Sequence, residues 1–346
     1  MFSLLFWLAV LAGAALIFAF FYFQSAIARP GPVAEDRTFV VERGATGATI
    51  ATALEQQGLI SDALLFRIAN RLSGGGALQA GEYLIPAHAS VQDIVNLMTD
   101  GDALQHAITF PEGITINAVM RILAESEVLT GELPAAPPEG SVLPDTYHVQ
   151  RGMTRAALLQ QMREARDAAV AEIWAARAPN LPITTPEELV ILASIVERET
   201  GVADERPLVA SVFVNRMRRP MRLETDPTII YGVCQRHPDR CVDDQRGLRL
   251  VDSRGNRRVI LLSEKNMRTP YNTYQIDRLP PTPIANPGRA ALEATANPAS
   301  SNAIFFVADG TGGHLFAATL AEHERNVERY RAYEAQRLAE QRRNNN

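Results

Sequence analysis

The chain has 346 residues, of which 47% are hydrophobic and 21% are charged, so its composition is that of an ordinary globular protein. Its net charge of −5, together with the lack of a basic stripe or RNA-binding motif, argues against nucleic acid as a partner. Lys265 is the only lysine and no glycine-rich loop precedes it, so we set aside phosphate-loop, Schiff-base and Ser-Lys chemistries, which would all rest on that one residue. We expect neither a bound cofactor nor a metal ion.

The N-terminus contains an apolar run without a charge, from Leu4 to Phe23, long enough to cross the roughly 30 Å hydrocarbon core of a bilayer. A cleaved signal peptide is the alternative, because Ala26-Ile27-Ala28 resembles a cleavage site. However, the run is longer than a typical signal-peptide core, and no Lys or Arg precedes it. We favour an uncleaved anchor over residues 1–25, with the bulk of the chain outside the cytoplasm, and a linker over residues 26–37.

Residues 38–104 have the pattern of a small α+β subdomain. We expect strands over 38–41 and 81–85, and helices over 47–57, 61–72 and 91–98. The first strand and the Gly-x-Thr-Ile-Ala helix start at Gly47 resemble a LysM-type glycan-binding module. A plain spacer domain is the alternative.

Residues 105–335 form a larger region that also mixes strands and helices. We expect a strand near 107–110, a helix over 116–126, an extended segment over 142–147 and a solvated helix over 155–177. Asp204 should cap a helix that runs to about Met217, a polar helix should follow Arg325, and residues 336–346 should form a disordered tail. The predicted fold class is α+β, with an N-terminal transmembrane helix, a small subdomain and a larger domain.

The helix expected over 185–201 carries the most informative pattern. Thr185 should cap it, Pro186 suits the first helical position, and Glu188 should complete a capping box. Gly201 should end the helix in the left-handed conformation.

The acids of this helix fall on different faces. On a helical wheel with Leu189 at 0°, the apolar side chains up to Val196 share one arc, and Glu199 falls inside it at about 280°. Glu197 falls on the more polar side, at about 80°. An apolar face removes hydration and raises the pKa of a carboxyl group, as a general acid for glycosidic-bond cleavage requires. The alternative is an ordinary acid at the last turn, which reaches solvent or pairs with an arginine.

Cys234 and Cys241 bracket a short loop that a disulfide could close, which fits an oxidising compartment. Free thiols are one alternative. A zinc site that includes His237 is another, but it lacks a fourth ligand. We favour the disulfide.

Several separated motifs then occur in order. They resemble the endolytic murein (lytic) transglycosylase family, also called YceG-like, over residues 38–332. The motifs are Leu-Pro-Asp-Thr-Tyr (143–147), Leu-Ala-Ser-Ile-Val-Glu-Arg-Glu-Thr (192–200), Val-Ala-Ser-Val-Phe-Val-Asn-Arg-Met (209–217), Met-Arg-Leu-Glu-Thr-Asp-Pro-Thr-Ile-Ile-Tyr-Gly (221–232), Pro-Tyr-Asn-Thr-Tyr (270–274), Pro-Pro-Thr-Pro-Ile-Ala-Asn-Pro-Gly (280–288) and Phe-Val-Ala-Asp-Gly-Thr-Gly-Gly-His (306–314).

The resemblance implies an inner-membrane anchor, a LysM-like subdomain over 38–104 and a YceG-like catalytic domain over 105–335 in the periplasm. It implies cleavage of the β-1,4 bond between N-acetylmuramic acid and N-acetylglucosamine in nascent peptidoglycan strands. This cleavage leaves a 1,6-anhydromuramyl end and limits strand elongation. Cell-wall synthases are the expected protein partners.

The family's essential glutamate is the second acid of a Glu-basic-Glu-Thr motif, which maps to Glu199. One carboxyl group would protonate the leaving oxygen and then, as a carboxylate, take the proton of the sugar's own 6-hydroxyl as that oxygen attacks C1. Glu197 would form a salt bridge or orient the neighbouring loop. The candidate sugar contacts, each of which could instead serve a turn, a loop or the core, are Asn215, Asp226, Thr228, Tyr231, Tyr271, Asn272, Tyr274 and His314.

The sequence departs from the family pattern in two places. Glu224 stands where the family usually has Gln, and an extra acid in the cleft could prepare a water, so a hydrolytic muramidase is one alternative. The segment 234–265 is longer than the family's usual connection and should form a surface hairpin. A second alternative is a non-catalytic peptidoglycan-binding scaffold that recruits a cell-wall synthase.

Overall fold

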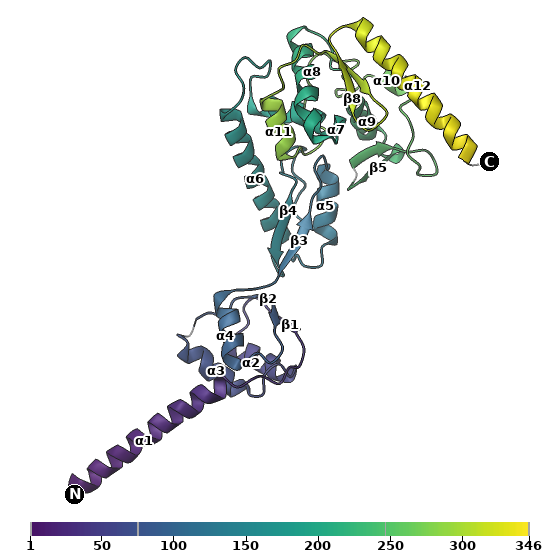
Figure 1. Ribbon diagram of the computed structural model, residues 1–346. Coiled ribbons are helices and arrows are strands. Elements are labelled where there is room, and N and C mark those ends of the chain that lie inside the picture. The colour runs from purple at the N-terminus through teal and green to yellow at the C-terminus, as the bar shows by residue number, and fades with distance from the viewer. Residues whose placement is uncertain (1, 75, 246, 345–346) are drawn as a thin grey trace. The chain divides into compact units, whose positions relative to one another are not determined.

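The computed structural model describes residues 2–74, 76–245 and 247–344 (Figure 1). It contains both helices and two-stranded sheets, which confirms the predicted mixture of α and β structure. The chain divides into two compact units. The first unit contains the residues up to Ala107 with 127–130 and 148–154, and the second contains 108–126, 131–147 and the residues from Arg155 onward.

Helix α1 (Phe2–Ile27) is apolar along its length, and large side chains such as Trp7, Leu11 and Phe18 are exposed on it. The 22 residues Phe6–Ile27 have a mean hydropathy of 2.2. A helix of that length spans about 33 Å, which exceeds the roughly 30 Å core of a bilayer. The described part of the chain therefore has an N-terminal helix long and apolar enough to cross a membrane. The expected linker is partly packed, because Ile27 and Val33 are buried in the core of the first unit.

The rest of the first unit is a two-stranded sheet covered by short helices. Strands β1 (Arg37–Val41) and β2 (Gly81–Ile85) pair antiparallel, with Arg37 opposite Ile85. The helices are α2 (Gly47–Gln56), α3 (Ala63–Leu72) and α4 (Val91–Asp100). The core is built from side chains with no measurable exposure, which include Leu54, Phe66 and Met98. These elements lie within a residue or two of their predicted bounds.

Local side-chain bonds set the ends of these helices. Asp62 accepts the amide hydrogens of Leu64 and Leu65, so α3 begins at Ala63. Ser90 and Asp93 form a capping box at α4. Gly101 ends α4 with φ = 79°, a conformation that glycine adopts without steric cost.

A ribbon of two strands, whose residues are divided between the two units, precedes the helices of the second unit. Strand β3 (Gln105–Thr109) pairs with β4 (Thr146–Gln150), so the extended segment predicted over 142–147 becomes a strand slightly later. Helix α5 (Ile116–Glu125) follows β3, and the long helix α6 (Arg155–Ala175) follows β4.

Helix α7 (Pro186–Glu199) is the centre of the second unit. It packs against α6, α8 (Arg206–Arg218), α9 (Asp226–Arg236) and α11 (Arg289–Ala296) (Figure 1). Every side chain from 189 to 197 is buried. The prediction that α7 has a more polar side is therefore wrong, because neighbouring helices surround α7. Ser194 is accommodated by hydrogen bonds, donating to the Ile191 carbonyl at 2.7 Å and accepting from the Ile284 amide at 3.0 Å.

The N-terminus of α7 matches its prediction in part. Thr185 caps the helix by accepting the Glu188 amide hydrogen at 3.1 Å. The Glu188 carboxylate accepts from the Thr184 amide at 2.6 Å rather than from that of Thr185, so the reciprocal half of the predicted capping box is displaced by one residue.

The C-terminal end of α7 differs from its prediction. The helix ends at Glu199 because Thr200 turns to an extended conformation with φ = −134°. Gly201 does not adopt positive φ, so the predicted left-handed stop is wrong. Asp204 lies in a short 3₁₀ turn, η1 (Ala203–Glu205), and does not cap α8.

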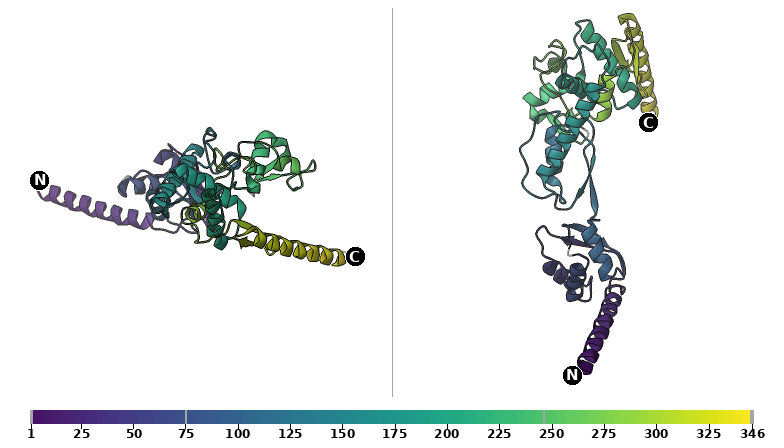
Figure 2. Two further views of the ribbon diagram at one scale, coloured as in Figure 1. Left: turned by 90° about the horizontal axis from the view of Figure 1, so that it is seen from above. Right: turned by 90° about the vertical axis from the view of Figure 1, so that its left-hand side faces the viewer.

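The remaining elements of the second unit follow α9. They are η2 (Pro238–Arg240), the hairpin β5 (Cys241–Asp244) and β6 (Gly247–Leu250), α10 (Leu262–Lys265), the hairpin β7 (Phe305–Ala308) and β8 (His314–Ala317), and α12 (Leu320–Asn344). Both views of Figure 2 show α12 as one continuous helix. Residues 336–344 are thus helical where a disordered tail was predicted.

Candidate functional site

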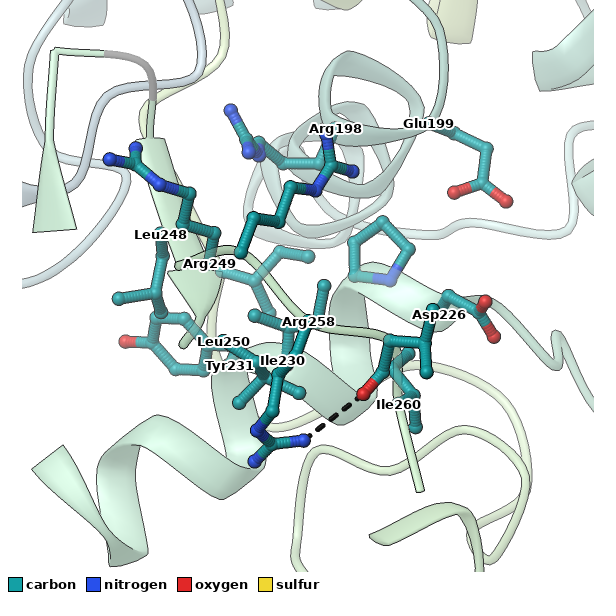
Figure 3. Close-up of a pocket in the computed structure, with 14 residues that line it drawn as sticks. Arg198, Glu199, Asp226, Ile230, Tyr231, Leu248, Arg249, Leu250, Arg258 and Ile260 are labelled. Atoms are coloured by element: carbon teal, nitrogen blue, oxygen red, sulfur yellow. Dashed lines mark hydrogen bonds between the residues drawn. The ribbon is translucent and has the colours of Figure 1, made fainter. Parts of the chain in front are cut away.

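A cavity of about 800 Å³ opens where the C-terminal end of α7 meets the N-terminal end of α9 (Figure 3). Its volume lies within the roughly 300–1,000 Å³ that ligand sites in proteins usually have. The lining comes from both helix ends, from β6, from residues 257–260 and from Ile284. Glu199 and Asp226 lie on one side of the cavity, and Arg198 and Arg249 lie on the other.

Glu199 lines the cavity from the last position of α7. Its Oε2 accepts a hydrogen bond from the Thr225 hydroxyl at 3.2 Å. Burial, followed by the negative charge of Asp226, raises the pKa of Glu199 from its ordinary value of 4.5 to about 7, against smaller opposing effects of Thr225 and Arg216. About half of the Glu199 carboxyl groups therefore carry a proton at pH 7. A group in this state can both donate and accept a proton near neutrality.

Asp226 is the first residue of α9 and lines the same cavity. Its Oδ1 accepts a hydrogen bond from the Tyr274 hydroxyl at 3.0 Å. Burial and the charge of Asp226 raise the pKa of Tyr274, so the phenol keeps its proton and remains a donor. Asp226 is thus hydrogen-bonded to Tyr274 and acts on Glu199 through its charge.

Glu197 serves a different environment and does not line this cavity. Its carboxylate accepts the Gly288 amide hydrogen at 3.0 Å and pairs with Arg206 at 3.4 Å. Arg206 also pairs with Glu112 at 3.0 Å. Burial raises the pKa of Glu197 as well, so a raised pKa alone does not distinguish the two acids of α7. The two acids differ because Glu199 lines the cavity and Glu197 does not.

Glu224 adopts a left-handed conformation with φ = 50°, and its side chain pairs with Arg216 at 3.3 Å. It is about half exposed and is not among the residues that line the cavity. This acid is therefore paired with an arginine and is not part of the cavity wall.

The other sequence candidates separate into two groups. Tyr231 lines the cavity, and its ring packs edge to face against Tyr271, with centroids 4.7 Å apart. The Tyr271 hydroxyl forms a hydrogen bond with Thr282 at 2.9 Å. Tyr231 therefore shares the cavity with Glu199 and Asp226, and Tyr271 packs against the Tyr231 ring.

The remaining candidates use their polar atoms inside the fold. Thr228 donates to the Thr225 carbonyl at 2.6 Å and is fully buried. The Asn272 amide donates to backbone carbonyls in the 265–267 segment, and the Asn215 amide donates to the carbonyls at 301 and 303. His314, on strand β8, pairs with Glu205 of η1 at 2.7 Å. None of these four residues lines the cavity.

The cysteines form a disulfide, with Cα atoms 5.8 Å apart, so the free-thiol and zinc alternatives are wrong. The bond links the end of α9 to the start of β5. The segment 234–265 contains the β5–β6 hairpin that was expected there, and β6 contributes residues 248–250 to the cavity.

Sequence reasoning missed several residues of the site. Thr225 contacts Glu199 directly, and Arg198, Arg249, Arg257 and Arg258 line the cavity. Two signals were available, because Thr225 lies within the 221–232 motif and arginines recur through the inserted segment. Neither signal predicts which side chains face the cleft, because that depends on where the β5–β6 hairpin lies in the folded chain.

The sequence was also compared with known proteins. The model of the YceG-like family matches residues 39–329. An endolytic murein transglycosylase of Streptococcus pneumoniae (serotype 2, strain D39) is 25% identical over an alignment of 334 residues, which covers 84% of this chain and 57% of the relative. This chain thus spans little more than half the length of that relative.

An endolytic murein transglycosylase of Bacillus subtilis (strain 168) is 25% identical over 347 aligned residues and is matched over 90% of both chains. The crystal structure of a yceG-like protein from Listeria monocytogenes has a TM-score of 0.48 and 24% identity, covering 84% of this chain and 99% of that one. Because the family match extends over most of the sequence, this chain belongs to the YceG-like family.

Proposed function

We propose that this chain is a membrane-anchored endolytic lytic transglycosylase of peptidoglycan. It cleaves the β-1,4 bond between N-acetylmuramic acid and N-acetylglucosamine within nascent strands and leaves 1,6-anhydromuramyl ends. The proposal depends on Glu199. This residue lines the cavity of about 800 Å³, and its carboxyl group has a pKa of about 7. The names of the pneumococcal and Bacillus relatives support the reaction class.

One carboxyl group is sufficient for this reaction. Protonated Glu199 donates its proton to the glycosidic oxygen as the bond from C1 to that oxygen breaks. The resulting carboxylate takes the proton of the 6-hydroxyl while O6 bonds to C1. The proton returns to Glu199, no water is consumed, and the tethered nucleophile lowers the entropic cost of attack.

The surroundings of Glu199 support both halves of the cycle. Burial and Asp226 keep the carboxyl group protonated near neutrality, as the first half requires. The Thr225 hydroxyl donates to Oε2, which fixes the orientation of the carboxyl group and stabilises the carboxylate that the first half produces.

Hydrolysis is the second candidate, and Asp226 favours it. Hydrolytic glycosidases usually place two carboxyl groups across the bond, and Asp226 is a second acid in the same cavity. Asp226 accepts the Tyr274 hydroxyl, which ties it to the protein. The two reactions differ by one water in the mass of the product, so product analysis separates them.

The remaining parts of the chain receive supporting roles in the proposal. Helix α1 is a single-pass inner-membrane anchor, and the rest of the chain lies in the periplasm, where the disulfide would persist. The segment 38–104 is a LysM-like subdomain that contacts glycan, and 105–335 is the catalytic domain. Cell-wall synthases are the protein partners, because the substrate is the strand that they extend.

The test compares the wild type with Glu199→Gln on purified sacculi, with mass analysis of the released fragments. Gln keeps an oxygen that can accept the hydrogen bond from the Thr225 hydroxyl but has no acidic proton to transfer, so we expect the rate to fall by about 10²- to 10⁴-fold. Glu224→Gln is the matched control, since that side chain lies outside the cavity, and it should retain anhydromuramyl product. Full activity in Glu199→Gln would refute the assignment. A product one water heavier would indicate hydrolysis, and binding without cleavage by the wild type would indicate a scaffold.

A further inference from the structure

Four arginines line the cavity that contains Glu199. Two of them are neutralised within the fold. Arg249 forms a two-pronged ion pair with Asp244, with both contacts at 2.7 Å. Arg258 forms another with Glu264, at 2.8 and 2.6 Å. These pairs hold the hairpin and the segment that follows it.

Arg198 and Arg257 differ from the other two. Within the described residues, no carboxylate lies at ion-pair distance from either guanidinium. The hydrogen bond that Arg198 makes is a long one, from Nη1 to the Gly113 carbonyl at 3.4 Å. Arg257 is exposed in the loop that follows β6. Two positive charges therefore face the cleft without an anionic partner among these residues.

The fold makes specific room for the Arg198 side chain. Gly113, in the turn after β3, and Gly247, at the start of β6, lie against it with φ of 73° and 85°. A Cβ on Gly247 would overlap the guanidinium, and one on Gly113 would lie 3.1 Å from the Arg198 Cδ. Two backbone segments that pack against the Arg198 side chain therefore fix the position of its guanidinium group at the cavity wall.

The Arg198 side chain is partly buried at the cavity wall. Burial lowers the pKa of Arg198, and the positive charge of Arg257 acts in the same direction. The charges of Glu197 and Asp243 oppose these effects. Both acids are engaged elsewhere, since Glu197 pairs with Arg206 and Asp243 accepts the Thr115 hydroxyl at 2.6 Å. A bound anion would offset the cost of removing the Arg198 charge from water.

We propose that Arg198 and Arg257 bind an anionic group of the glycan substrate, a carboxylate or a phosphate, and so position the strand against Glu199. The inference rests on the proposed function for the identity of the ligand. Guanidinium groups suit both oxyanions, because their N–H donors match two oxygens at once. A nascent strand offers two sources, namely the carboxylates of its stem peptides and the phosphates of a lipid-linked end.

The experiment measures binding rather than cleavage. The full chain carrying Glu199→Gln is titrated against fluorescently labelled, uncrosslinked, lipid-linked strands, alone or combined with Arg257→Gln or Arg198→Gln. Arg254→Gln is the matched control, because Arg254 is exposed on the same loop but does not line the cavity. Two further substrates separate the sources. In one, the stem-peptide carboxyl groups are amidated, and in the other, the lipid phosphates are removed by mild acid.

We expect Arg257→Gln to raise the dissociation constant for native strands about tenfold, the loss typical of one charge-assisted hydrogen bond. Arg198→Gln should have at least that effect, and thermal unfolding checks that it folds. On the substrate that lacks the recognised anion, the effect of Arg257→Gln should vanish, which identifies the source. If Arg257→Gln binds like the Arg254→Gln control, or if its effect persists on both neutralised substrates, the inference is wrong. Failure of the wild type to cleave would instead refute the proposed function, and the binding result would stand separately.

Discussion

The charge of Asp226 should control the pH range in which the protein cleaves glycan. Asp226 is the second cause of the raised pKa of Glu199, after burial. Asp226→Asn removes that charge and keeps an oxygen to accept the Tyr274 hydroxyl. Loss of a nearby negative charge makes deprotonation easier, so the pKa of Glu199 should fall.

The size of the effect follows from the protonated fraction of Glu199. With the ordinary pKa of 4.5, about 0.3% of these groups would be protonated at pH 7, against about half at a pKa of about 7. Because burial is the larger cause, we expect Asp226→Asn to lower the pKa by about one unit. The protonated fraction at pH 7 then drops to about a tenth, and the rate of a step that needs the acid drops about fivefold. At pH 5 the group is almost fully protonated in the wild type and about nine-tenths protonated in Asp226→Asn, so the rates should be nearly equal.

The assay follows anhydromuramyl product by mass spectrometry between pH 5 and 9. Asp167→Asn provides the same substitution on α6, where the aspartate side chain is 68% exposed, and it should leave the profile unchanged. The wild-type rate should decline with a midpoint near pH 7, and the Asp226→Asn midpoint should lie lower. A midpoint that stays in place or moves upward in Asp226→Asn would refute the assignment of Glu199 as the titrating acid.

Two further predictions concern stability. Burial raises the pKa of Glu139 from 4.5 to about 8 in the folded chain. Between these two pH values the carboxyl group is protonated in the folded chain and ionised in the unfolded chain, so the free energy of unfolding falls as pH rises from about 4.5 to about 8. We expect Glu139→Gln, which keeps an acceptor for the Ile116 amide, to raise Tm by several degrees at pH 8 and to leave it unchanged at pH 4; equal gains at both values would contradict the reasoning. The Cys234–Cys241 bond closes a loop with a sequence separation of 7. Its loss in the double serine variant should lower the free energy of unfolding by roughly 2 kcal/mol in urea titrations. Wild type treated with reductant should match that variant, and an unchanged midpoint in both would contradict the prediction.

Helix α7, which carries Glu199, shows which features of a site can be predicted from residues adjacent in sequence. The capping threonine and the proline correctly placed the start of α7, because N-terminal capping depends on residues that are adjacent in sequence. Its end was misplaced onto Gly201, since the stop comes from the extended turn at Thr200. The wheel placed Glu199 on an apolar face, yet four neighbouring helices bury α7 almost completely. Both Glu197 and Glu199 consequently have raised pKa values, and only one of them reaches the cavity.

The sequence by itself determined the apolar N-terminal helix, the mixture of helices and strands, and the motifs that identify the family, because these depend on composition and on residues close together in the chain. Tertiary structure alone decided which polar side chains face the cleft. Thr228 and Asn272 satisfy their hydrogen bonds inside the fold, whereas Thr225 and four arginines reach the Glu199 site. The physical reason is that a side chain's environment is set by segments distant in sequence, here α7, α9 and the β5–β6 hairpin, which meet only when the chain folds.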